Sequence, residues 1–295
     1  MPTIIVPLLC DRTKTDPHGV SERALPWARG LAKQLAAEVV LLTALDIPPR
    51  LLAMADQALL RQLLDDWRAE CRTYLEEVAR TFDGRVVSLE VDEGDPASAI
   101  VRIASQVNEP LVTMASHLRT GLSRLVLGSI AMRVVSFIEC PVFIVGQRVP
   151  APPETAAVEV SRVLVPLDGS SLAEQALDAL SVAGFTGLHV ILLYVTEPGA
   201  RDRLGERDLR PDAYLADVAA RLKKRGFTVE TSVREGKPPA AIVATAGEMR
   251  ADLIAMTTHG RSGLRAVLMG STVEQVLHGA NTPVLLARPR GESSG

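Results

Sequence analysis

The stretch GDPASAIV, which begins at Gly94, returns almost unchanged as GKPPAAIV from Gly236. The offset between Gly94 and Gly236 carries further features of the first half onto the second. They are Met114 and Met256, His117 and His259, the pairs Gly128-Ser129 and Gly270-Ser271, and the pairs Pro141-Val142 and Pro283-Val284. A repeat of this length means that one structural unit occurs twice along the chain. We therefore expect two domains of the same fold.

The two copies differ in length near their starts. IIVPLL from Ile4 matches VLVPLD from Val163, and the stretch from Ile4 to Gly94 is longer than the stretch from Val163 to Gly236. We expect the extra residues of the first copy in loops and in its second helix. Between the copies, Pro150, Pro152 and Pro153 favour an extended, solvated connection, because proline fits neither a helix interior nor a central strand. The expected boundaries are 1–148 for the first domain, 149–159 for the linker and 160–290 for the second domain.

Each copy alternates short apolar runs with longer segments of helical period. In the second copy the runs are RVLVPL, HVILLYV, TVETSV, DLIAMT and PVLLA, and the segments between them predict helices that start near residues 171, 211, 239 and 271. Runs that are apolar at almost every position are buried on both faces, which requires helices above and below a mostly parallel sheet. The predicted fold class is α/β, with two tandem doubly wound domains, each a five-stranded, mostly parallel sheet with helices on both faces. The last strand of each copy opens with proline and is expected at an edge or an interface.

Composition excludes several classes of protein. An apolar share of 47% over 295 residues is sufficient for two buried cores, whereas a net charge of −3 and an aromatic share of 3% provide neither the basic field nor the stacking surfaces that nucleic acids require. No run approaches the roughly twenty apolar residues of a membrane span, and the start of the chain lacks the layout of a secretory signal. Cys10, Cys71 and Cys140 show no paired spacing, which favours free thiols in a reducing compartment. We expect a cytoplasmic protein with no nucleic-acid or membrane partner.

The candidate ligand residues follow the strands of the second copy, because open parallel sheets bind ligands beyond the carboxyl ends of their strands. The loop after the fourth strand reads TTHGRSGLRAVLMGST from Thr257 to Thr272. Its glycines allow close backbone approach, and its last three residues open a helix whose free amides, hydroxyls and dipole favour an anion. Asp168, after the first strand, can accept a hydrogen bond from an exocyclic amine or a ribose hydroxyl. The alternatives are an ordinary N-cap for Ser271, and an N-cap or Asx-turn of the next helix for Asp168.

With these residues, both halves resemble universal stress protein domains. That family places a strand ending in Val-Pro-x-Asp first and carries a late signature of glycine, two residues, glycine, nine residues, glycine and then serine or threonine, followed by a Pro-Val strand. The second copy matches with Val165-Pro166-Leu167-Asp168, Gly260, Gly270-Ser271 and Pro283-Val284. Thr257 alone departs, because it stands where the first glycine is usual. The resemblance covers essentially both halves and implies a fold like that of the adenine nucleotide alpha-hydrolases.

The resemblance implies that the second domain binds an adenine nucleotide, above all ATP. In ATP-binding members the acid after the first strand and the backbone after the second strand hold adenine, the glycine loop follows ribose and phosphates, and Gly-Ser/Thr binds the phosphate tail. The residues implied here are Pro166, Leu167, Asp168, Val195, Met256, Thr257, His259, Gly260, Arg261, Gly263, Gly270, Ser271 and Thr272. A side chain at Thr257 lies where the backbone is close to ribose, so affinity is expected to be lower. Mg²⁺ is implied only with the nucleotide, held mainly by phosphate oxygens.

The first copy departs further from the family pattern. Leu9 stands in the place of Asp168, and Ala115 and Leu118 occupy the early glycine positions, whereas Gly128-Ser129 remains. Leucine accepts no hydrogen bond from adenine, and a side chain at position 118 crowds the backbone path. We predict that the first domain binds nucleotide weakly or not at all and forms an intramolecular pseudo-dimer with the second domain, with a further homodimer left open. The alternative is that its Gly-Ser pair holds a smaller anion.

No catalytic or metal-binding pattern stands out in the sequence. The only Gly-Lys pair, Gly236-Lys237, precedes proline and lacks the Ser or Thr of a Walker A motif. His117 and His259 share a place in both copies, but no orienting acid or nucleophile accompanies them, so a structural role is preferred. The histidines and cysteines lack zinc-ligand spacing, and hydrolysis is expected to be slow or absent. Three functions stay open: a nucleotide-responsive stress or signalling protein, a nucleotide-free interaction module, and a slow ATPase on the same fold.

Overall fold

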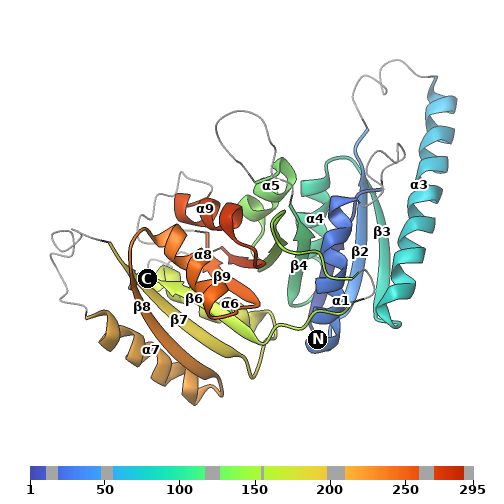
Figure 1. Ribbon diagram of the computed structural model, residues 1–295. Helices are drawn as coiled ribbons and strands as arrows, with labels where there is room; N and C mark the ends of the chain where they lie inside the picture. The colour runs from blue at the N-terminus through green and yellow to red at the C-terminus, as the bar shows by residue number, and fades with distance from the viewer. Residues whose placement is uncertain are drawn as a thin grey trace, which may run out of the picture. The chain divides into compact units, whose positions relative to one another are not determined.

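The computed structural model describes residues 1–10, 19–47, 56–116, 127–153, 156–197, 210–258 and 269–288. The chain divides into two compact units of helices and strands (Figure 1). Unit 1 consists of Met1–Ala115, Ser129–Ile138 and Ala151–Glu159, and unit 2 consists of Ser116–Gly128, Glu139–Pro150 and Val160–Gly295. The last strand of the first copy therefore belongs to unit 2.

Unit 1 contains a parallel sheet of four strands in the order β3-β2-β1-β4. The strands are β1 (Thr3–Pro7), β2 (Glu38–Leu45), β3 (Val86–Glu93) and β4 (Pro110–Ala115). The inner strands β1 and β2 are the apolar runs of the sequence, and nearly all of their side chains are buried. Burial on both faces explains why these runs show no alternation of apolar and polar residues.

The helices of unit 1 cover both faces of this sheet. They are η1 (Val20–Ala24), α1 (Leu25–Gln34), α3 (Gln57–Ala79), η2 (Arg80–Phe82), α4 (Pro96–Ala104) and α5 (Ser129–Phe137). The crossovers through α1 and α3 step along the sheet in one direction, and the crossover through α4 steps back. Because parallel crossovers are right-handed, α4 lies on the opposite face from α1 and α3, where it packs against α5.

Unit 2 contains six strands in the order β5-β10-β9-β6-β7-β8. They are β5 (Val142–Val145), β6 (Arg162–Leu167), β7 (His189–Thr196), β8 (Thr228–Glu235), β9 (Leu253–Thr257) and β10 (Val284–Ala287). All neighbours are parallel except β5 and β10, which pair antiparallel. Pro141 and Pro283 immediately precede β5 and β10, as expected for strands that open with proline. The described residues thus give each copy five strands, which confirms the predicted α/β class.

The helices of unit 2 are α6 (Ser171–Val182), α7 (Pro211–Lys224), α8 (Pro238–Glu248) and α9 (Ser271–Gly279). Their starts agree with the predicted positions to within one residue. The same handedness rule places α6 and α7 on one face and α8, which packs against α9, on the other. The α3 helix of the first copy has 23 residues and the corresponding α7 has 14, which confirms that part of the extra length lies in the second helix.

Part of the predicted linker is fastened to α1 within unit 1. We call residues 151–153 and 156–159 the strap. Val158 N donates to Pro26 O at 3.1 Å, and Arg29 Nε donates to Ala156 O at 3.2 Å. Gly30 permits this contact, because a Cβ at this position would lie 1.8 Å from Val158 O. The prediction of a wholly solvated connection is wrong for these residues, since α1 supplies hydrogen-bond partners to them.

Candidate functional site

The strand order of unit 2 reverses between β6 and β9. From β6 the chain adds β7 and β8 on one side and then returns to add β9 on the other side. The ladder between β6 and β9 ends at Leu164 and Ile254, whereas the ladder between β6 and β7 continues to Leu167 and Tyr194. The strands β6 and β9 therefore separate toward their carboxyl ends, at the type of reversal point where open α/β sheets bind ligands.

Asp168 and Val195 are neighbours at this edge of the sheet. Leu167 pairs with Tyr194, and Asp168 and Val195 are the residues that directly follow this pair. Both are half-buried. The structure thus brings together the acid and the backbone segment that the family resemblance places around the base.

The turn after β6 orients the Asp168 carboxylate. Its Oδ1 accepts hydrogen bonds from Ser170 N at 3.0 Å and from Ser170 Oγ at 2.6 Å. Gly169 between them has a φ of 84°, a left-handed conformation that favours glycine. Ser170 Oγ in turn accepts from Ala173 N at 3.1 Å and caps α6. The Asx-turn considered as the alternative for Asp168 is therefore present, and it uses two of about four acceptor sites of a carboxylate.

The end of β9 is buried and tied to the start of α9. Met256, Thr257 and Thr258 are all nearly inaccessible, with exposed fractions of 8%, 6% and 2%. Thr258 O accepts a hydrogen bond from Gly270 N at 2.8 Å. A Cβ on Gly270 would lie only 3.3 Å from the same oxygen, so this close approach favours glycine. The Gly-Ser-Thr segment therefore begins beside the end of β9, on the edge that carries Asp168.

The N terminus of α9 is chemically different from that of α6. Gly270 is the N-cap of α9, with φ −68° and ψ 144°, and glycine has no side chain that could accept from the first-turn amides. Ser271 is exposed and Thr272 is half-buried. In α6 the equivalent place is held by Ser170, whose hydroxyl already caps the helix. The amides, the two hydroxyls and the positive end of the helix dipole make the start of α9 suitable for an anion.

The remaining predicted ligand residues divide into two groups. Pro166 and Leu167 end β6 directly before Asp168. His259, Gly260, Arg261 and Gly263 lie outside the described residues.

The equivalent edge of the first copy carries an apolar side chain. Leu9 follows β1 as Asp168 follows β6, and 56% of its surface is exposed. Its backbone N donates to Ser21 Oγ at 2.9 Å. Further along the copy, Gly128 N donates to Ser116 Oγ at 3.3 Å, where the second copy uses a backbone carbonyl. The first copy therefore keeps the tie at its Gly-Ser pair but lacks the carboxylate acceptor.

The universal stress protein family model matches residues 15–146 and again residues 159–288. The chain belongs to the universal stress protein family. The universal stress protein MJ0531 of Methanocaldococcus jannaschii is 34% identical over 133 residues, which cover 44% of this chain and 78% of that protein. A universal stress protein from Archaeoglobus fulgidus DSM 4304 shares the fold, with 22% identity and a TM-score of 0.69 over 99% of this chain and 97% of its own. A universal stress protein solved in complex with cAMP aligns with 44% of this chain and 99% of its own, at 26% identity and a TM-score of 0.36.

Sequence reasoning did not identify two residues near Asp168 in the second universal stress protein domain. Tyr214 Oη donates to Glu174 Oε1 at 3.0 Å, and Arg221 forms an ion pair with the same carboxylate. The Tyr214 ring meets the Tyr194 ring edge-on, with centroids 6.1 Å apart. Burial raises the pKa of Tyr214, and the negative charges of Glu174 and Asp168 raise it further. This network ties the first turn of α6 to α7, next to the turn that orients Asp168.

The first universal stress protein domain repeats this tyrosine contact. Tyr74 Oη donates to Glu22 Oε1 at 2.7 Å, and burial together with Glu22 raises the pKa of Tyr74. A sequence signal for it exists, because YLEEVA from Tyr74 matches YLADVA from Tyr214. The offset between these two segments differs slightly from that between Gly94 and Gly236, so the match lies outside the main alignment of the copies.

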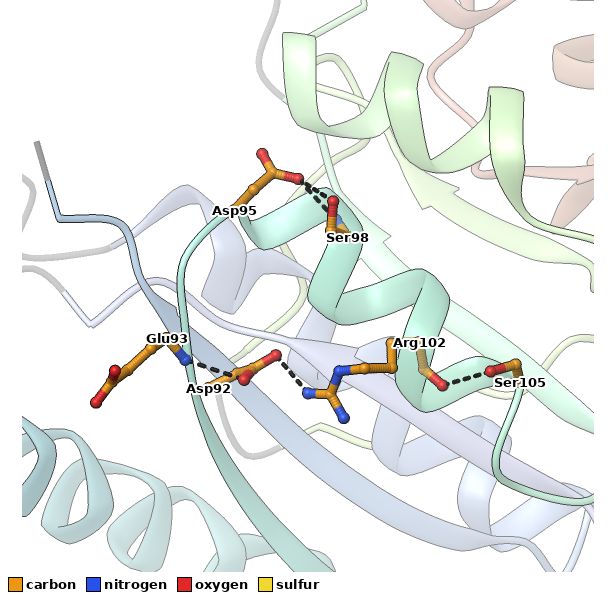
Figure 2. Close-up of polar contacts among 6 residues, drawn as sticks. All are labelled: Asp92, Glu93, Asp95, Ser98, Arg102 and Ser105. Atoms are coloured by element: carbon orange, nitrogen blue, oxygen red, sulfur yellow. Dashed lines mark hydrogen bonds and ion pairs between the residues drawn. The ribbon is translucent and has the colours of Figure 1, made fainter. Parts of the chain in front are cut away.

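The repeated GDPAS segment starts a helix in the first domain (Figure 2). Asp95 is the N-cap of α4, and its Oδ2 accepts from Ser98 N at 2.8 Å and from Ser98 Oγ at 2.7 Å. Arg133 of α5 binds the same carboxylate, with Nη2 2.8 Å from Oδ2. Ser98 first, and Arg133 second, hold the pKa of Asp95 below its usual value. Arg102 pairs in the same way with Asp92, so these acids serve helix capping and helix packing.

In the ranges that the structure describes, no group of three or more His, Cys, Asp and Glu side chains is arranged to hold a metal ion. None of the helices in those ranges combines the length and the apolar character that crossing a membrane requires.

Proposed function

We propose that the second universal stress protein domain binds an adenine nucleotide, with ATP as the first choice, and that its nucleotide state governs a stress or signalling response. The proposed domains span 1–148 and 160–290, joined by 149–159. The observation that supports this proposal is the adjacency of Asp168 and Val195 at the strand-order reversal, on the edge where α9 begins with a glycine N-cap.

In this proposal each part of the nucleotide meets a different element. The Asp168 carboxylate, held in place by Ser170, accepts from the exocyclic amine or a ribose hydroxyl, and the Val195 backbone contacts the base. The start of α9 binds the phosphates through its amides and hydroxyls. Three or four charge-assisted hydrogen bonds of about 1.5–3 kcal/mol each are sufficient for micromolar affinity after association costs. The proposed contact residues are Pro166, Leu167, Asp168, Val195, Met256, Thr257, His259, Gly260, Arg261, Gly263, Gly270, Ser271 and Thr272.

The residues of the described site fit the group that the family implies. Gly270 keeps the backbone open where a Cβ would lie 3.3 Å from Thr258 O, and the donors at the start of α9 match the acceptors of a phosphate. Bound Mg²⁺ would neutralise part of the phosphate charge, with Ser271 and Thr272 as the nearest hydroxyls of this chain. We assign these residues binding and orientation, and we expect at most slow hydrolysis.

The direct test is to denature the purified full-length protein and to chromatograph the released small molecules. About one adenine nucleotide per chain after incubation with Mg-ATP supports the proposal. Absence of nucleotide contradicts it and favours a nucleotide-free interaction module. Rapid appearance of ADP contradicts the binding-only role and favours an ATPase.

Asp168→Ala and Leu9→Ala form a matched pair for locating the site. Both side chains follow the first strand of their copy. Asp168→Ala should weaken ATP binding at least tenfold, because it removes a charged acceptor, whereas Leu9→Ala should leave affinity unchanged. Equal effects of the two changes in isothermal titration calorimetry, with cAMP as a competing ligand, would show that the second domain is not the working copy.

We also propose a cytoplasmic location. The support is that Cys10, Cys71 and Cys140 are free thiols, and unpaired cysteines are typical of a reducing compartment.

A further inference from the structure

Unit 1 contains a cavity of about 420 Å³ beside the strap. Small-molecule sites commonly have volumes of about 300–1,000 Å³. The cavity lies between η1, α1 and the C-terminal part of α3, and Ala151 and Pro152 of the strap form part of its wall. Its other lining residues are Glu22, Arg23, Leu25, Pro26, Arg29, Tyr74, Glu77, Val78 and Thr81.

The charges on this wall are unevenly buried. Arg29 is only 9% exposed, and its guanidinium is fixed by Thr81 Oγ1 at 3.2 Å, by Ala156 O and by the Phe82 ring at 5.9 Å. Glu77, in contrast, is exposed. A permanent positive charge that is held in one orientation beside apolar walls is prepared for a planar anion.

The equivalent groove of unit 2 is closed by its own side chains. The groove between α6 and α7 has a volume of about 200 Å³, and it is spanned by the ion pairs Arg221–Glu174 and Arg225–Asp178. The match of YLEEVA with YLADVA places Thr81 where Arg221 stands in unit 2. The shorter Thr81 cannot bridge the groove, so the cavity is a property of the first copy and not of the shared fold.

We propose that the cavity of unit 1 binds a small monocarboxylate with a flat apolar body. The carboxylate lies on the Arg29 guanidinium, and the body packs against Leu25, Val78 and Pro152. Leu25 and Val78 are buried, so an apolar ring removes little further protein surface from water but fills the empty volume between these side chains. The site is independent of the proposed nucleotide site, and through Pro152 it makes the position of the strap sensitive to its ligand.

Three probes of one shape and different charge test this assignment on the full-length protein. They are 2-naphthoate, neutral 2-naphthylmethanol and cationic 2-naphthylmethylamine, each titrated by calorimetry to millimolar concentration. We expect 2-naphthoate to bind at least tenfold more tightly than the other two, because a charge-assisted pair favours the anion. Absence of saturable binding, or equal binding of all three probes, overturns the proposal.

Two sets of variants locate the bound probe. Arg29→Gln keeps a donor for Ala156 O but removes the charge, so 2-naphthoate should fall to the affinity of 2-naphthylmethanol while the neutral probe is unaffected. Ala151→Phe fills the cavity from an exposed strap position and should abolish binding. Ala157→Phe is the matched control, because residue 157 is an exposed strap residue outside the cavity. Unchanged binding in Ala151→Phe, or an unchanged anion preference in Arg29→Gln, overturns the proposal.

Discussion

Gly30→Ala tests how the strap is held in unit 1. Gly30 lies inside α1, and a Cβ there would come within 1.8 Å of Val158 O and within 2.4 Å of Val158 C. These are backbone atoms, which cannot turn aside as the end of a flexible side chain can. The strap must therefore move away from α1, which breaks the bonds from Val158 N to Pro26 O and from Arg29 Nε to Ala156 O.

The size of the effect follows from these contacts. The neutral hydrogen bond contributes about 1 kcal/mol to the free energy of unfolding, and the bond from the guanidinium contributes about 2 kcal/mol. Alanine is favoured over glycine inside a helix by about 1 kcal/mol, which offsets part of the loss. The expected net decrease in the free energy of unfolding is roughly 2 kcal/mol. In urea this corresponds to a midpoint lower by about 1 M.

Tryptophan fluorescence isolates the unit concerned. Trp27 and Trp67 are the only tryptophans of the chain, and both belong to unit 1. Gly247→Ala is the control, because Gly247 lies in α8 and its Cβ would meet nothing within 4 Å. We expect this control to be neutral or stabilising when unfolding is followed by circular dichroism. If Gly30→Ala raises its fluorescence midpoint or leaves it unchanged, the strap is not held as described.

Three further substitutions test other contacts. Because Ser98 above all lowers the pKa of Asp95, this carboxylate stabilises the protein above its ordinary pKa of about 4 and ceases to do so as pH falls through the lowered value. Asp95→Asn should therefore flatten the acid limb of a plot of stability against pH, and an identical limb would contradict this. Glu174→Gln removes a charge that raises the pKa of Tyr214, so NMR of labelled tyrosine should show that pKa closer to the ordinary value of about 10, with burial maintaining part of the shift; an unmoved titration would rule out Glu174 as a cause. Gly270→Ala places a Cβ 3.3 Å from a backbone oxygen, so calorimetry should show several-fold weaker ATP binding and chemical unfolding a loss of about 1 kcal/mol, whereas unchanged affinity would place the phosphates elsewhere.

The parts of the fold that sequence predicts well are those set by local pattern. The run HVILLYV becomes β7 because apolar residues at every position suit a strand buried on both faces, and α9 starts at Ser271 as the Gly-Ser pair indicates. Sequence predicts the strap less well, since its partners on α1 are far away in the chain and proline-rich composition carries no information about them. The pairing of β5 with β10 likewise depends on which edges are free once both sheets exist.

Site residues are predictable where a single position carries the chemistry. The repeat marks Asp168 and Leu9 as equivalent, so the loss of an acceptor in the first copy is visible in the sequence alone. The contact between Tyr214 and Glu174 is not predictable in this way, because it joins two helices whose relative position follows from packing on the sheet.

Divergence of the two copies acts on two separate places of a shared frame. At the carboxyl edge, exchanging Asp168 for Leu9 removes a charged acceptor without altering the strands, because the side chain lies beyond the last ladder pair. Between the helices, exchanging Arg221 for Thr81 removes an ion pair and leaves unfilled volume, because threonine is too short to reach the opposite helix. Neither exchange disturbs the buried runs that form the sheets, so each copy can lose one ligand chemistry and gain another at little cost in folding. A chain of this kind can respond to two ligands through one fold, which is the condition that the ATP and 2-naphthoate titrations test separately.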